Sequence, residues 1–84
     1  MTGPPPAAVV AEILTIARQV LGLPVLGADD DLVAAGATSL AMLRIVATAC
    51  RSLDIDIAPG SLGGAPVTVN VLARAAATAG PLRP

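Results

Sequence analysis

Few side chains in this chain of 84 residues have the chemistry that a functional site needs, and a serine at position 39 is the most suggestive of them. The sequence contains no histidine, so neither a Ser-His-Asp triad nor a Cys-His pair can be built from it. It also contains no lysine, which excludes a glycine-rich phosphate loop of the kind that ends in lysine. The chain is therefore predicted to have no catalytic residue and not to be an enzyme.

The remaining reactive groups are a single cysteine and six acidic residues. Cys50 has no histidine that could activate it, so we expect a partly exposed, inert thiol. A paired-carboxylate active site needs two carboxyls held across a cleft, and a bundle this small has little room for one. The adjacent Asp29, Asp30 and Asp31 are therefore interpreted as a solvated turn that can open a short helical turn. One cysteine and no histidine leave too few ligands for zinc, and we predict no bound metal.

Composition predicts the class of fold. Alanine, valine and leucine dominate, aromatic residues are absent, and alanine and leucine lose little side-chain freedom in a helix. A β-sandwich without Phe, Tyr or Trp would be unusual. The prediction is one small all-α domain, a bundle of three to four helices with a long first loop. Its predicted organisation is a flexible lead-in over residues 1–6, a domain over residues 7–79 and a frayed tail over residues 80–84.

Net charge and hydropathy exclude two classes of partner. The formal net charge is −1, so the chain lacks the basic surface that nucleic-acid binding requires. The mean hydropathy is +0.81, but Glu12 and Arg18 interrupt the first apolar stretch and Arg44 and Arg51 the second, so neither stretch can span a membrane. The first residues lack the basic flank of a signal peptide, and we expect a cytoplasmic monomer.

Hydrophobic periodicity predicts three helices. The first covers residues 7–21 and ends at Gly22 as a left-handed cap. The second covers residues 39–53, and the last begins after Thr68 as its N-cap and ends at Gly80. The residues expected to face the core are Val10, Ile13, Leu14, Ala17, Val20 and Leu21 in the first helix, Met42, Ile45, Val46, Ala49 and Leu53 in the second, and Val69, Leu72, Ala73 and Ala76 in the last.

Residues 23–38 form the longest connection between the predicted helices. The loop holds too many large aliphatic side chains for a solvated linker, so it is expected to fold back and pack against the helices. These side chains are Leu23, Val25, Leu26, Leu32 and Val33. Residues 54–57 break the helical period and are interpreted as an extended loop. Glycines and prolines between residues 58 and 67 allow no more than one helical turn there.

The segment that leads into the second helix places Ser39 where that helix begins, directly before Leu40. It reads DDLVAAGATSL from Asp30 to Leu40. Gly36 can turn the loop with a positive φ, and a serine hydroxyl at the mouth of a helix lies outside it. An anion attached at this point would lie against free N–H groups and the positive end of the helix dipole.

This segment resembles the attachment motif of phosphopantetheine-dependent carrier proteins, which include acyl carriers and peptidyl carriers. In that motif an acidic residue and two large apolar residues precede Leu-Gly-Gly, then Asp or His, then Ser-Leu. The matching positions are Asp30 for the acid, Leu32 and Val33 for the apolar pair, Gly36 for the first glycine and Ser39-Leu40 for the final pair, with Thr38 in the place of Asp or His. Further segments resemble those of peptidyl carriers: Arg44-Ile45, Leu53 to Ile57, and Pro66 with Thr68-Val69 and Leu72-Ala73.

The resemblance implies a 4'-phosphopantetheine arm attached covalently to Ser39, with Gly36, Thr38 and Leu40 flanking the attachment point. Such carriers hold an acyl or aminoacyl group as a thioester and present it to successive enzymes. The implied partners are a phosphopantetheinyl transferase, an adenylation or acyl-loading enzyme, and condensing or tailoring enzymes. The expected docking surface for these partners consists of Leu40, Leu43, Arg44 and Ala47. The alternative is that the three apolar residues belong to the outer core and that Arg44 is a solvated charge on the helix face.

The second helix favours the peptidyl branch of the family. Carriers of fatty-acid synthesis typically present an acidic second helix, whereas no Asp or Glu lies between Leu40 and Leu53 and two arginines do. We expect a free-standing peptidyl carrier of nonribosomal peptide or related specialised metabolism. Two alternatives stay open. The chain could be an acyl carrier protein for polyketide-type acids, or a helical docking module that is never modified. As a separate alternative for the residue itself, Ser39 could merely cap the second helix.

Overall fold

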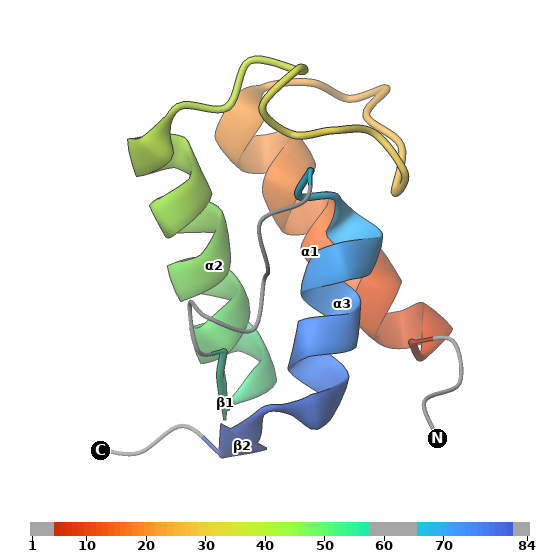
Figure 1. Ribbon diagram of the computed structural model, residues 1–84, viewed down its shortest axis with the longest axis vertical. Helices are drawn as coiled ribbons and strands as arrows, with labels where there is room; N and C mark the ends of the chain where they lie inside the picture. Colours follow the sequence, from red (N-terminus) through yellow and green to blue (C-terminus); the bar gives the residue numbers. More distant parts are fainter. Residues whose placement is uncertain (1–4, 58–65, 82–84) are drawn as a thin grey trace.

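The structure is a computed structural model, and it describes residues 5–57 and 66–81. Its helices are α1 (Ala7–Leu21), α2 (Ser39–Leu53) and α3 (Val69–Thr78), and its two short strands are β1 (Ile55–Asp56) and β2 (Gly80–Pro81). α1 packs against both α2 and α3 and runs in the opposite direction to them (Figure 1). The start of α2 therefore lies at the same end of the bundle as the end of α1 and the loop between them (Figure 1). The predicted helical bundle is confirmed, with three α-helices in the parts of the chain that the structure describes.

Each helix ends or begins at a residue that suits the position. Gly22 follows α1 in the left-handed conformation, with φ of 67°, and its N–H donates to the carbonyl of Arg18. Asp54 follows α2 in the same conformation, with φ of 56°. Thr68 caps α3, and its hydroxyl oxygen accepts the N–H of Val71 at 3.1 Å. The predicted bounds of α1 and α2, the Gly22 cap and the Thr68 cap are all confirmed.

The core consists of aliphatic side chains from all three helices and the loops. Its buried residues are Ile13, Ile16, Ala17, Leu26, Leu32, Ala37, Ile45, Ala49, Ile57, Val69, Leu72, Ala73, Ala75 and Ala76. Every helical residue predicted to face the core is buried or half-buried. Ile16 is buried as well, although it lies beside the predicted stripe, because α1 packs against both α2 and α3 and so buries a wider arc.

The loop between α1 and α2 buries only part of its aliphatic surface. Leu26 and Leu32 lie in the core, and the Nε–H of Arg18 donates to the carbonyl of Leu26 at 2.9 Å. Val25 and Val33 are 89% and 62% exposed, so the loop folds back onto the helices as predicted without burying all of its large aliphatic side chains. Each valine is the neighbour of a buried leucine, and in a tight turn two adjacent side chains rarely face the same core.

The chain returns toward the end of α2 after α3 ends. Ala79 is extended, with φ of −74° and ψ of 148°, and leads into β2. β1 and β2 pair antiparallel, with Ile55 opposite Pro81 and Asp56 opposite Gly80. The predicted extended segment after α2 therefore contains a strand. Gly80–Pro81, predicted to belong to a frayed tail, is paired instead, because the extended Ala79 carries the chain back to β1.

Some predictions concern residues that lie outside the described ones: the start of the lead-in (1–4), the end of the tail (82–84) and most of the glycine- and proline-rich segment (58–65). Among the helices within residues 5–57 and 66–81, none has both the length and the apolar character that crossing a membrane requires.

Candidate functional site

Ser39 is the first residue of α2, and its side chain is exposed. The residue that caps this helix is its neighbour Thr38, which has extended backbone angles (φ −80°, ψ 170°). The Thr38 hydroxyl oxygen accepts the N–H of Ala41 at 3.1 Å, and the Thr38 carbonyl accepts the N–H of Met42 at 2.9 Å. The alternative interpretation, in which Ser39 serves as the helix cap, is therefore wrong.

Capping by Thr38 determines which backbone donors remain at the start of α2. A helix begins with four N–H groups that have no partner within the helix. The Met42 N–H already makes the first regular helical bond, to the Thr38 carbonyl, and the Thr38 hydroxyl satisfies the N–H of Ala41, so the N–H groups of Ser39 and Leu40 are the helical donors that the cap does not use. Both lie next to the exposed Ser39 side chain, at the positive end of the helix dipole, where an anion is stabilised.

The loop before Ser39 contains the short helical turn predicted from the aspartates. The Asp31 carboxylate accepts the N–H of Val33 at 3.0 Å, and the Asp31 carbonyl accepts the N–H of Ala35 at 2.9 Å, which closes one helical turn. Gly36 then takes φ of 108°, a conformation that favours glycine. The N–H of Ala37 donates back to the carbonyl of Leu32 at 2.9 Å, so the chain reaches α2 from a closed loop.

The three consecutive aspartates have three different structural roles. The Asp29 carboxylate accepts a hydrogen bond from the side-chain amide of Asn70, at the start of α3. The Asp30 carboxylate accepts the N–H of Gly27 at 2.8 Å, and Asp31 opens the helical turn described above. Each carboxylate thus fastens a different part of the loop.

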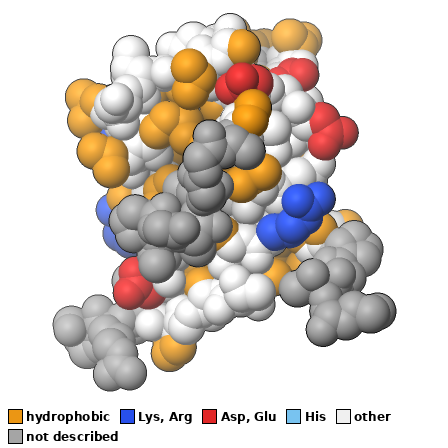
Figure 2. All heavy atoms as spheres, viewed as in Figure 1, with side chains coloured by type: hydrophobic (Ala, Val, Ile, Leu, Met, Phe, Trp, Pro, Cys, Tyr) orange, Lys and Arg blue, Asp and Glu red, His pale blue; other side chains and the backbone are white. Residues whose placement is uncertain are grey.

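The outward face of α2 is apolar with a basic edge. Leu40 and Leu43 are 65% and 67% exposed, and Ala47 beside them is exposed. Arg44 and Arg51 are exposed as well, and α2 contains no acidic residue. At about 100° per residue these five side chains fall within about 100° of arc around the helix. Figure 2 shows hydrophobic side chains at the upper left, where the first turns of α2 lie in Figure 1.

Cys50 lies three turns beyond Ser39 on α2 and is half-buried. Its sulfur accepts the N–H of Ile57 at 3.5 Å, which holds the segment after α2 against the helix. The predicted partial exposure is confirmed.

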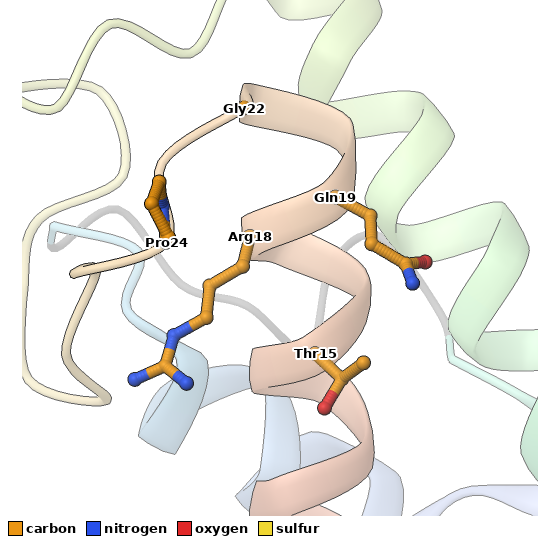
Figure 3. A pocket seen from close by; sticks show the side chains of 5 residues that line it. All are labelled: Thr15, Arg18, Gln19, Gly22 and Pro24. Carbon is orange, nitrogen blue, oxygen red and sulfur yellow. The ribbon is translucent and has the colours of Figure 1, made fainter.

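A shallow hollow lies at the end of α1, where Gly22 turns the chain into the loop. Its lining residues are Thr15, Arg18, Gln19, Gly22 and Pro24 (Figure 3). The Arg18 side chain bends toward the loop, in keeping with its hydrogen bond to the Leu26 carbonyl (Figure 3). None of the residues predicted for the functional site lines this hollow, so it is separate from the start of α2.

Comparison with known protein families shows which family the chain belongs to. The family described as "phosphopantetheine attachment site" matches residues 11–75, from α1 to α3. The chain belongs to this family. Its members carry a covalently attached 4'-phosphopantetheine, usually on a serine, and are carrier domains that are generally non-catalytic. A phosphopantetheinyl transferase modifies them, and synthetase enzymes interact with them. No curated protein and no solved structure shows a significant match to the chain.

The residues at the start of α2 fit such a group. The Ser39 side chain is accessible, two backbone N–H groups beside it can face a phosphodiester, and Leu40 offers an exposed apolar contact. The capping role of Thr38 was missed in the sequence, although the rule that identified Thr68 as a cap applies equally to it. The contact of Asn70 with the loop was also missed, because its partner Asp29 is 41 residues away and no local pattern joins them.

Proposed function

We propose that Ser39 carries the phosphopantetheine arm and that this protein is a peptidyl carrier, which holds an aminoacyl group for the enzymes of nonribosomal peptide or related specialised metabolism. The observation that carries this proposal is the exposed Ser39 side chain at the first position of a helix that Thr38 already caps. A serine that caps a helix has its side-chain oxygen held against a backbone N–H, whereas at the start of α2 the Thr38 oxygen takes that position and leaves the Ser39 hydroxyl free to react.

The modification requires Ser39 to act as a nucleophile toward coenzyme A. The Ser39 oxygen forms a new bond to the phosphorus that bears the pantetheine arm. The bond from that phosphorus to the adenosine bisphosphate portion breaks, and the serine proton passes to a base of the transferase. The chain itself contributes an accessible hydroxyl and the N–H groups of Ser39 and Leu40, which favour the phosphodiester anion. When bound, the arm supplies a thiol that carries the aminoacyl group as a thioester.

Two features support an aminoacyl cargo over the acids of fatty-acid synthesis. The face of α2 next to Ser39 contains arginines and no acidic residue, so partners that select carriers by negative charge should bind it weakly. The segments Arg44-Ile45 and Thr68-Val69 also resemble those of peptidyl carriers. The partners in this proposal are an adenylation enzyme that loads the arm and condensing or tailoring enzymes that receive its cargo, all in the cytoplasm.

The exposed face of α2 is the proposed docking surface for these partners. It consists of Leu40, Leu43, Arg44 and Ala47. Two leucines that are about two-thirds exposed leave apolar area that a partner can bury, and they lie within two helical turns of Ser39. A partner that covers this face therefore has its active site within reach of the arm.

Intact-mass measurement after incubation with a broad-specificity transferase and coenzyme A tests the attachment. The expected result is a gain of one phosphopantetheine in the wild-type protein and in Ser52→Ala, a matched serine on the same helix, and no gain in Ser39→Ala. An unmodified wild-type protein would contradict the proposal. Loading the modified protein with adenylation or with acyltransferase enzymes then separates an aminoacyl cargo from a polyketide-type acid.

A further inference from the structure

The loop that leads to Ser39 is fastened to the start of α3 by three hydrogen bonds. The N–H of Leu32 donates to the carbonyl of Val67 at 2.9 Å, and the N–H of Asn70 donates to the carbonyl of Ala28 at 3.1 Å. The third bond joins the side-chain amide of Asn70 to the Asp29 carboxylate. Asn70 thus holds two consecutive loop residues, one with its backbone and one with its side chain.

A hydrogen-bonded path continues from this contact to Ser39. Leu32, whose N–H is held by Val67, is buried, and its own carbonyl accepts the N–H of Ala37 at 2.9 Å. Ala37 is also buried and directly precedes the cap residue Thr38. The position of Thr38, and with it that of Ser39, therefore depends on where the loop is held against α3.

The starts of α2 and α3 differ in one respect. In both helices a threonine side chain accepts the N–H three residues later at 3.1 Å. In α3 the N–H of the second helical residue, Asn70, is occupied by the loop carbonyl of Ala28. The corresponding group of α2, the N–H of Leu40, has no such partner among the described residues. The loop is therefore anchored on α3, and the start of α2 stays accessible.

We propose that Asn70, through its contact with Asp29, is a positioning residue that holds the Ser39 loop in the form that the transferase recognises. This inference rests on the proposed attachment of the arm to Ser39. A loop that is already held in its bound form loses less conformational freedom when the transferase docks, so modification is faster. Released from Asn70, the loop would have to be ordered by the transferase.

The test is an exchange of donor and acceptor between the two side chains. Asn70→Asp places two carboxylates together and breaks the bond, and kcat/KM for modification is expected to fall about threefold to tenfold. Adding Asp29→Asn restores one amide and one carboxylate in reversed order, and the rate should return to within about twofold of wild type. Gln19→Glu makes the same amide-to-acid change on exposed α1 and should leave the rate unaltered.

Rates are compared at a temperature at which circular dichroism shows every variant folded. Amide hydrogen exchange should accelerate at Leu32 and Ala37 in Asn70→Asp, not at Ile13 in α1, and recover in the double variant. Asp29→Ala, which removes the acceptor without adding charge, replaces Asn70→Asp if that variant does not fold. A wild-type rate for Asn70→Asp, or no recovery in the double variant, overturns the proposal. A wild-type protein that gains no arm overturns the proposed function instead, and the exchange data still report on the loop contact.

Discussion

Thr38 and Ser39 are adjacent, yet only Thr38 caps α2: its hydroxyl oxygen accepts the N–H of Ala41 at 3.1 Å, while the Ser39 side chain is exposed. One hydroxyl is thus committed to helix stability, and the next is available for modification. The attachment motif usually has Asp or His where this chain has Thr38, and aspartate and threonine are both good N-caps. Thr38 therefore preserves the helix cap without adding a charge beside Ser39.

This division predicts opposite results for two neighbouring alanine substitutions. Thr38→Ala removes the cap and should cost about 1 kcal/mol of unfolding free energy, which lowers Tm by roughly 4–8 °C in a domain of this size. Ser39→Ala removes no cap and should change Tm little. Thermal unfolding followed by circular dichroism measures both. Equal losses for the two variants would show that Ser39 shares the capping role.

The loop pair Leu32 and Val33 should differ just as clearly. Leu32 is fully buried, so Leu32→Ala leaves a cavity and should cost about 2–5 kcal/mol. Val33 is mostly exposed, and Val33→Ala should change the unfolding free energy by less than about 0.5 kcal/mol. Urea unfolding of both variants checks the comparison. A large loss at Val33 would mean that the loop packs differently.

Gly36 has φ of 108°, and a Cβ added there would meet no atom within 4 Å. Gly36→Ala should therefore destabilise through backbone strain alone, by about 1–3 kcal/mol. Because the strained residue lies three positions before Ser39, modification by the transferase should also slow. Unfolding and intact-mass kinetics on the same protein measure the two effects. An unchanged Tm would contradict the left-handed conformation of this loop.

The exposed face of α2 should matter for partner binding and not for stability. Leu43→Ala is expected to raise KM for the transferase about fivefold or more, since a buried apolar anchor in an interface contributes more than about 1 kcal/mol. Val25→Ala, which truncates an even more exposed aliphatic side chain in the loop after α1, is the matched control and should leave KM unchanged. Equal effects at both positions would argue against a specific docking face.

The helices were predictable because their signals are local. Periodic apolar residues define α1 and α2, and Gly22 and Thr68 mark an end and a start by rules that involve only their neighbours. The sequence did not predict which loop residues are buried and which are exposed. Val25 and Leu26 both have apolar side chains, and only tertiary packing determines that Leu26 is buried and Val25 exposed.

The sequence predicted the candidate attachment residue, Ser39, but not the contacts that hold the loop before it. Ser39 stands in a recognisable motif, and the family comparison covers it. The contact between Asp29 and Asn70 joins two distant segments, and the pairing of β1 with β2 involves two residues on each side. Neither contact produces a periodic pattern in the sequence, so both become visible only in the folded structure.

Mapping the modified residue tests the central claim most directly. Because the chain has no lysine, trypsin cuts only after arginine and releases residues 19–44 as one peptide, whose only hydroxyl side chains are those of Thr38 and Ser39. After reaction with a transferase and coenzyme A, fragmentation of this peptide should place one phosphopantetheine on Ser39. A peptide that stays unmodified, or that carries the arm on Thr38, would contradict the account.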